Sequence, residues 1–183
     1  MFQFSTLQSN LSMPSVNITV NGAGASTQLT PIGTTPNWEC VNETSNDGDT
    51  TYVRNTTASP LIDTYTFDAS SIPATAYIRS VLISGLCKRV NTGGTRRRVI
   101  RIGGTNYFSS SQSLTTNYSN GASNPVFFTN PANSLPWKVS DLSTMEIGIE
   151  LTGGTDARCT NCMITINYSI VNLPIQSFGI LRN

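Results

Sequence analysis

The chain has 183 residues, of which 38% are hydrophobic and 11% are charged, and its formal net charge is +1. This length suits one domain with a continuous core, and the small net charge creates no field that would attract nucleic acid or a membrane. The chain contains no histidine, which excludes Ser-His and Cys-His nucleophile pairs and imidazole metal sites. Serine, threonine, asparagine and glycine take the place of charged residues, as is typical of extracellular or particle-bound proteins.

The charged residues are unevenly distributed along the sequence. None occurs in residues 1–38, 102–137 or 159–181. Because the cores of protein interfaces are depleted in charge, these tracts predict contact with other protein chains. The alternative is that they are Ser/Thr/Asn-rich loops of an ordinary β domain.

Residues 1–35 are expected to form an extended N-terminal arm. Residues 15–20 alternate between polar and apolar types as a strand does, and the Gly/Ala/Asn run at 21–25 interrupts the pattern. A single strand of this kind cannot bury itself. It must therefore add to its own sheet, or to the sheet of a neighbouring subunit by strand exchange.

Residues 36–171 are assigned to a β domain and 172–183 to an apolar C-terminal tail. The clearest strand is 145–151, where four apolar residues alternate with two glutamates and a glycine after one helical turn at 140–144. A hairpin of 76–90 with 95–107 is expected at the centre of one sheet. Strands are predicted at 50–54, 61–67, 76–90, 95–107, 125–129, 145–151 and 162–170. These patterns predict an all-β fold, a jelly-roll-like antiparallel β-sandwich with an extended N-terminal arm and a C-terminal tail.

An ordered set of short motifs across about residues 38–170 resembles a family of structural proteins from tailed bacteriophages. The motifs are Trp38, DGDTTYV at 47–53, DTYTF at 63–67, IRSV at 78–81, Gly103-Gly104, PWKVSDL at 136–142 and EIGI at 146–149. The resemblance implies a β-sandwich domain of a head, neck or tail component. The expected location is therefore the virion, in agreement with a start, Met1-Phe2-Gln3-Phe4, that lacks the basic and apolar parts of a signal peptide.

The carboxylates give no enzymatic pattern. Glu146 and Glu150 share one strand face at roughly 13 Å by strand rise, which is wider than the carboxylate pairs of glycosidases. No catalytic residue and no cofactor are predicted. The turn at 46–50 could offer two or three oxygens to Ca²⁺, but a complete site needs six or more, so a plain β-turn is the preferred interpretation.

Four cysteines, Cys40, Cys87, Cys159 and Cys162, leave three alternatives. Buried free thiols are the first. A disulfide is the second, within the Cys159–Cys162 pair or from one of these to Cys40 or Cys87. The third is structural zinc, but the single CxxC pair makes a tetrathiolate site incomplete, so no metal is predicted.

Six basic residues flank the turn at 91–94 and predict a two-sided basic ridge at a hairpin tip. Nucleic-acid binding is not expected, because the sequence shows neither aromatic residues between the basic ones nor a recognition helix. Solvated arginines, or docking onto acidic groups of a neighbouring subunit, are the two interpretations. The ridge consists of Lys88, Arg89, Arg96, Arg97, Arg98 and Arg101.

These patterns lead to the hypothesis of a bacteriophage virion protein, acting in capsid decoration or in the neck or tail by protein–protein assembly. Its partners would be other copies of itself, in a trimer or ring, and other virion proteins, with no membrane contact. The alternative is a carbohydrate-binding domain of a receptor-recognising tail fibre, with a glycan platform that includes Trp38 and Tyr118. The expected assembly interface consists of Phe2, Phe4, Leu7, Leu11, Val16, Ile18, Val20, Leu173, Ile175, Phe178, Ile180 and Leu181.

Overall fold

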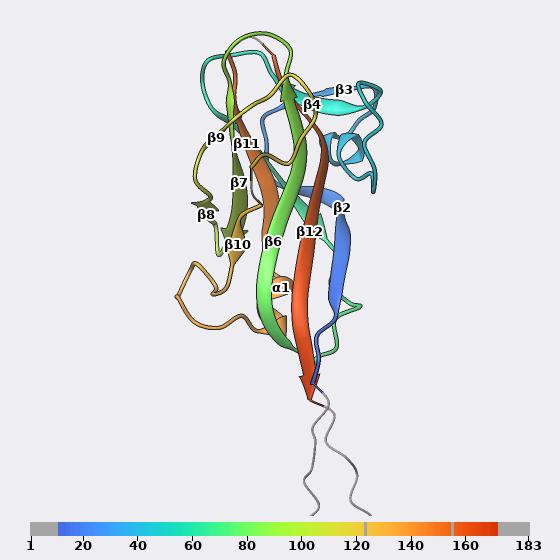
Figure 1. The fold of residues 1–183 in the computed structure, drawn as a ribbon, viewed down its shortest axis with the longest axis vertical. Helices are drawn as coiled ribbons and strands as arrows, with labels where there is room; N and C mark the ends of the chain where they lie inside the picture. Colours follow the sequence, from blue (N-terminus) through green and yellow to red (C-terminus); the bar gives the residue numbers. More distant parts are fainter. Residues whose placement is uncertain (1–10, 123, 155, 172–183) are drawn as a thin grey trace, which may run out of the picture.

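The computed structural model describes residues 11–122, 124–154 and 156–171. The fold is all-β, antiparallel and sandwich-like, as the sequence predicts (Figure 1). Its strands and helices are β1 (Leu11–Ser12), β2 (Ser15–Thr27), β3 (Thr30–Ile32), η1 (Asn37–Cys40), β4 (Tyr52–Asn55), β5 (Leu61–Phe67), β6 (Tyr77–Arg89), β7 (Thr95–Ile102), β8 (Thr105–Phe108), β9 (Gln112–Ser113), β10 (Val126–Phe127), α1 (Val139–Leu142), β11 (Glu146–Thr152) and β12 (Ala157–Val171).

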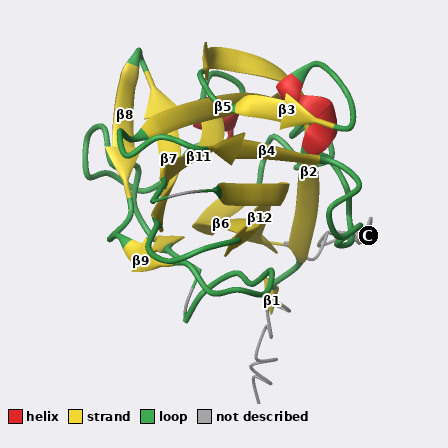
Figure 2. Ribbon diagram, turned by 90° about the horizontal axis from the view of Figure 1, so that it is seen from above, coloured by secondary structure: helices red, strands yellow, loops and turns green. Residues whose placement is uncertain are grey.

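Strand β2 joins the two halves of the sandwich, which are β10-β6-β12 on one side and β5-β11-β7-β8 on the other. The strand order is β10-β6-β12-β2-β5-β11-β7-β8. Residues 15–19 of β2 pair with β12, and residues 20–27 pair with β5 across two register shifts. The shifts coincide with the Gly/Ala-rich run, because residues without bulky side chains let a strand bend at a bulge. Seen from above, the strands curl around a common interior (Figure 2).

Residues 15–32, expected in the N-terminal arm, lie inside this sheet. Of the two alternatives open to the strand at 15–20, addition to its own sheet is the one observed. The reason is burial, since Val20 is 2% exposed in the core and Val16 and Ile18 pack against that core. Residues 1–10 and 172–183 lie outside the described residues.

The expected hairpin of 76–90 with 95–107 is corrected by the strand pairing. Strand β6 pairs with β12 and β10, whereas β7 pairs with β11, β8 and β9, so the two strands belong to opposite halves. The segment expected as one strand turns back at Gly103 and Gly104, with φ of 56° and 85°. Two consecutive positive φ angles are what a tight hairpin turn requires, so β7 and β8 form the hairpin instead.

Strand β11 lies between β5 and β7 and carries the apolar face that the sequence predicts. Ile147, Ile149 and Leu151 are 0% exposed. Glu150 is also buried, although the alternation predicts that it faces solvent. The strand is central in the sheet and its second face is covered too, which the period of two alone cannot show.

The short helix α1 closes one end of the core, next to the preceding loop. Leu142 is 1% exposed, and Trp137 is 4% exposed with its indole N–H donating to the Phe127 carbonyl oxygen at 2.9 Å. None of the helices in the described ranges has the length and apolar character needed to cross a membrane.

Candidate functional site

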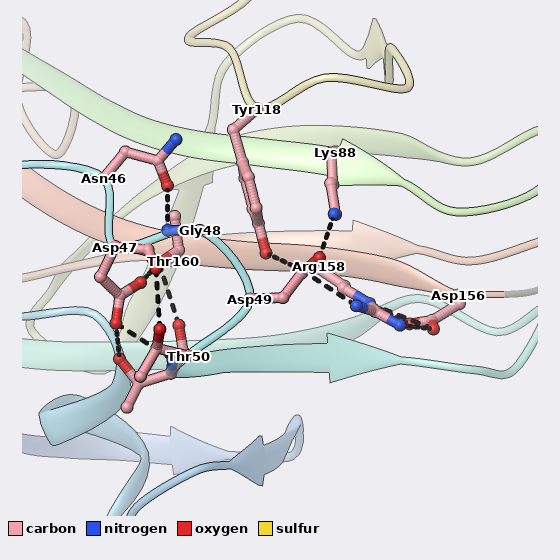
Figure 3. Close-up of polar contacts among 11 residues, drawn as sticks. Asn46, Asp47, Gly48, Asp49, Thr50, Lys88, Tyr118, Asp156, Arg158 and Thr160 are labelled. Atoms are coloured by element: carbon pink, nitrogen blue, oxygen red, sulfur yellow. Dashed lines mark hydrogen bonds and ion pairs between the residues drawn. The ribbon is translucent and has the colours of Figure 1, made fainter.

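The turn at 46–51 belongs to a polar cluster on the surface and is fixed by its own side chains (Figure 3). The Gly48 N–H donates to Asn46 Oδ1 at 2.9 Å, and Gly48 has a φ of 76°, which glycine adopts without steric cost. The Thr51 N–H donates to Asp47 Oδ2 at 3.1 Å. Side-chain bonds of this kind are what Asn and Asp provide in turns. The turn predicted from the sequence is therefore present.

A bulge in β12 ties this turn to the sheet. The pairing of β12 with β6 shifts register between Cys159 and Asn161, which frees Thr160 from the ladder. The Thr160 hydroxyl lies 2.7 Å from Asp47 Oδ1 and 2.9 Å from the Thr51 carbonyl oxygen. Thr160 is 0% exposed, so these two hydrogen bonds attach the turn to the buried side of the sheet.

Asp49 is the centre of the charged part of the cluster. Its carboxylate accepts hydrogen bonds from Lys88 Nζ at 2.6 Å, the Tyr118 hydroxyl at 2.9 Å and Arg158 Nη1 at 3.0 Å. Partial burial alone would raise the pKa of Asp49, but these three donors hold it at about 2. The Asp49 side chain is 46% exposed, so solvent screens these interactions.

Arg158 extends the cluster along β12. Its guanidinium donates to Asp156 Oδ2 at 2.6 Å and lies over the Tyr52 ring at 4.5 Å. The hydrogen bond to Asp156 raises the pKa of Arg158, and Asp49 adds to that effect. Lys88 in turn lies 4.7 Å from the centroid of the Tyr118 ring. Cations above aromatic faces contribute about 0.5 to 1 kcal/mol each at exposed sites.

The cluster holds the 46–51 turn, β6 and β12 together and presents no free acid, base or nucleophile. Asp47, Asp49 and Asp156 each accept bonds from neighbouring side chains. Within the described ranges, no group of three or more Asp, Glu, Cys or His side chains could hold a metal ion. The plain turn is therefore the interpretation that the geometry supports, and Ca²⁺ is not proposed.

The six residues of the predicted basic ridge do not form one solvent-exposed surface, because two of them are buried. Arg96 and Arg98 are each 1% exposed. Arg97 donates from Nε and Nη2 to the two oxygens of Glu150 at 2.6 and 2.7 Å. The alternation places residues on the two faces of β7 but cannot show that the face with Arg96 and Arg98 is fully buried and that the face with Arg97 and Arg101 is partly covered. The three remaining basic residues bind nearby groups. Lys88 binds Asp49, Arg89 Nε donates to the Leu114 carbonyl oxygen at 2.8 Å, and Arg101 Nη1 donates to Asn106 Oδ1 at 2.9 Å.

The two aromatic residues predicted for a glycan platform are engaged in separate places. Trp38 lies in η1 and packs against the core, whereas Tyr118 donates to Asp49. Within the described residues, the contacts of Trp38 and Tyr118 do not place the two rings together on one surface that could stack against a sugar.

One cavity, of about 420 Å³, lies between the loop after β5 and the helix α1. Its walls include Phe67, Ile72 and Val139, and Asp68 is the ionisable residue in its lining. None of the residues predicted for a site lines this cavity. It is a partly apolar recess that is separate from the polar cluster.

The four cysteines are free and buried. The disulfide considered for Cys159 and Cys162 is thus not formed, although both residues lie on β12. The contacts around Cys87 and Cys159 were not visible in the sequence, because they depend on the register between β6 and β12. Comparison of the chain with protein families, with curated proteins and with solved structures gave no match.

Proposed function

We propose that this chain is a structural protein of a bacteriophage particle, in capsid decoration or in the neck or tail, and that it acts by protein–protein assembly rather than catalysis. The motif resemblance across about residues 38–170 and the antiparallel sandwich support this proposal. The long uncharged tracts at both ends of the sequence support it as well.

The observation that carries the proposal is the position of the two ends of the described chain. Strand β1 pairs with the end of β12, with Leu11 opposite Val171. The described chain therefore begins and ends at one pole of an elongated sandwich (Figure 1). The sequences that continue from this pole are rich in apolar residues, namely Phe2, Phe4, Leu7, Leu173, Ile175, Phe178, Ile180 and Leu181.

The same pole carries exposed apolar side chains within the described residues. Met13 is 68% exposed between β1 and β2, and Tyr77 is 60% exposed where β6 pairs with Ser169 of β12. Burying apolar surface contributes about 25 cal/mol per Å², so contact through this pole would favour association. The interface proposed here therefore centres on the pole and the terminal segments, without Val20.

The chemistry of the polar cluster agrees with a binding protein. Its carboxylates and cations are paired with each other, as in the bonds of Asp49 to Lys88 and Arg158. Such pairs stiffen a scaffold, and they leave no poised acid–base group in the cluster.

Light scattering on the full chain tests the assembly proposal. The variant with Ile175→Asp and Phe178→Asp is expected to have a lower mass than the wild type, because charge in an apolar interface is costly. Phe128→Asp is the control, since Phe128 is 70% exposed on the loop after β10, and it is expected to keep the wild-type mass. A tail variant with unchanged mass would contradict the proposal.

The virion assignment has a separate test. The chain is expected to co-sediment with purified phage particles in a density gradient and to be identified there by mass spectrometry. Particles that lack the chain would show that it assembles elsewhere.

A further inference from the structure

Two arginines are buried between the halves of the sandwich beside a pair of cysteines. Arg96 and Arg98 on β7 reach across to β6, where Arg96 Nη1 lies 3.4 Å from the Cys87 carbonyl oxygen and Arg98 Nη2 donates to the Gly85 carbonyl oxygen at 3.0 Å. Both guanidinium groups also donate to carbonyl oxygens of the loop at 119–120. The cations therefore cross-link β7, β6 and this loop.

No carboxylate balances these two charges in the part of the chain that the structure describes. The ion pairs there join other residues, and Arg96 Nε, Arg96 Nη2 and Arg98 Nε have no hydrogen-bond partner. A buried guanidinium without an anion costs several kcal/mol. The thiol of Cys87, which is 0% exposed, is an acidic group that feels the charges of both arginines.

The surroundings shift the pKa values of the two thiols in opposite directions. Burial would raise the pKa of Cys87, but the hydrogen bond from Cys159 and the charges of Arg98 and Arg96 lower it below its ordinary value. The hydrogen bond with Cys87, together with burial, raises the pKa of Cys159. A cysteine with a lowered pKa beside a second thiol has the acid–base character of a redox pair, and here both thiols are buried.

The backbone places the two cysteines in the pairing geometry that brings side chains closest. Cys87 on β6 lies directly opposite Cys159 on β12. The N–H and carbonyl of Cys87 both bond to Ser119 on the other side, at 3.0 and 3.1 Å. Cys87 and Cys159 are therefore a non-hydrogen-bonded pair, in which Cα atoms are about 4.5 Å apart. That separation lies within the range that a disulfide spans.

We propose that Cys87 and Cys159 form a redox-active pair that closes to a cross-strand disulfide when the protein meets hydrogen peroxide. The Cys87 thiolate attacks one peroxide oxygen, the O–O bond breaks, and Cys87 sulfenic acid and hydroxide form. The Cys159 sulfur then attacks the Cys87 sulfur. The S–S bond forms, the S–O bond breaks, and the Cys159 proton leaves with the hydroxyl as water.

The alternative partner for Cys159 is Cys162, which the CxxC spacing suggests. Cys162 lies opposite Gly85, which has no side chain, and is not in a cross-strand pair with another thiol. The thiol of the fourth cysteine, Cys40, donates to the Thr34 carbonyl oxygen at 3.2 Å. The structure thus favours a link that joins two strands over one within a strand.

The test uses the full chain, reduced, freed of reductant and treated with hydrogen peroxide. Free thiols are then alkylated in denaturant and the protein is digested for peptide mapping. The expected result is the loss of two alkylatable thiols and one linked peptide pair that contains Cys87 and Cys159. The variant with Cys40→Ser and Cys162→Ser is expected to give the same link.

A second variant traps the intermediate. With Cys159→Ser, the sulfenic acid at Cys87 has no resolving thiol and is expected to react with dimedone, whereas Cys87→Ser gives no dimedone adduct at Cys159. A Cys159–Cys162 link, a mixture of links, or four unchanged thiols after peroxide treatment would each overturn the proposal.

Discussion

Replacing Asp63 is expected to destabilise the domain more than replacing any carboxylate of the surface cluster. Asp63 lies on β5 and is 0% exposed. Its Oδ1 accepts the N–H groups of Gln28 at 2.6 Å and Leu29 at 2.8 Å, and its Oδ2 accepts from Asn37 Nδ2 at 2.7 Å and the Tyr65 hydroxyl at 3.1 Å. One carboxylate therefore holds the end of β2, the helix η1 and β5 together.

The cost of Asp63→Ala follows from the donors that would lose their acceptor. The Gln28 N–H keeps a bond to the Ile62 carbonyl oxygen at 3.2 Å, but Leu29, Asn37 and Tyr65 each lose one. A buried donor without a partner costs about 1 to 3 kcal/mol, so the expected loss is about 4 kcal/mol, a large part of the about 5 to 15 kcal/mol that stabilises a domain.

Urea unfolding followed by tryptophan fluorescence measures this loss. Asp68→Ala is the matched control, because Asp68 is exposed and accepts a hydrogen bond from the nearby Ser70 N–H. Burial raises the pKa of Asp63, so the protonation-linked part of its stability is present below the unfolded pKa of about 4 and is lost as the pH rises through the folded pKa. The hydrogen bonds to its oxygens do not depend on that part, so both variants are compared at one fixed pH. Equal unfolding midpoints for the Asp63 and Asp68 variants would refute the reasoning.

Three further predictions concern the surface cluster and β11. The pKa of Asp49 is lowered to about 2, so the stability that it contributes is present above pH 4 and is lost as the pH falls towards 2. The thermal unfolding midpoint of Asp49→Asn should therefore converge with that of the wild type between pH 4 and 2. A difference that stays constant over this range would contradict the prediction. Arg97→Ala leaves the Glu150 carboxylate, 6% exposed, without its partner and should cost about 2 kcal/mol in urea unfolding, whereas Arg101→Ala, whose contact with Glu146 is 4.0 Å, should cost less than about 0.5 kcal/mol. Gly148→Ala places a methyl group against the Asp63 carbonyl oxygen and should cost about 2 kcal/mol; an unchanged midpoint would show that β5 and β11 are less close than described.

The sequence predicts the parts of the fold that depend on local periodicity. The alternation of Ile147, Ile149 and Leu151 identifies a buried face because a strand directs every second side chain to the same side. The turn around Gly48 is also predicted, because Asn and Asp bond to the main chain within two to four residues of themselves. Both features depend only on residues that are close together in the sequence.

Local periodicity does not predict which strands pair when they are far apart in the sequence. The segments of β6 and β7 are adjacent in sequence and strongly β-forming, yet their partners are β12 and β11. The side chains of Arg96 and Arg98 are buried because β6 and the loop at 119–120 offer carbonyl oxygens, none of which is local to β7. The partners of Asp63, at 28–37, are equally distant in sequence. Contacts of this kind are set by topology, which local propensity does not specify.

Photo-crosslinking at the two poles of the full chain tests the central claim, that copies assemble through the pole where β1 meets β12. A photoreactive amino acid at Met13, exposed at that pole, is expected to crosslink one copy to another. The same residue placed at Thr92, in the exposed connection between β6 and β7 at the opposite end, is expected to give none (Figure 1). Crosslinks from Thr92 with none from Met13 would contradict the account.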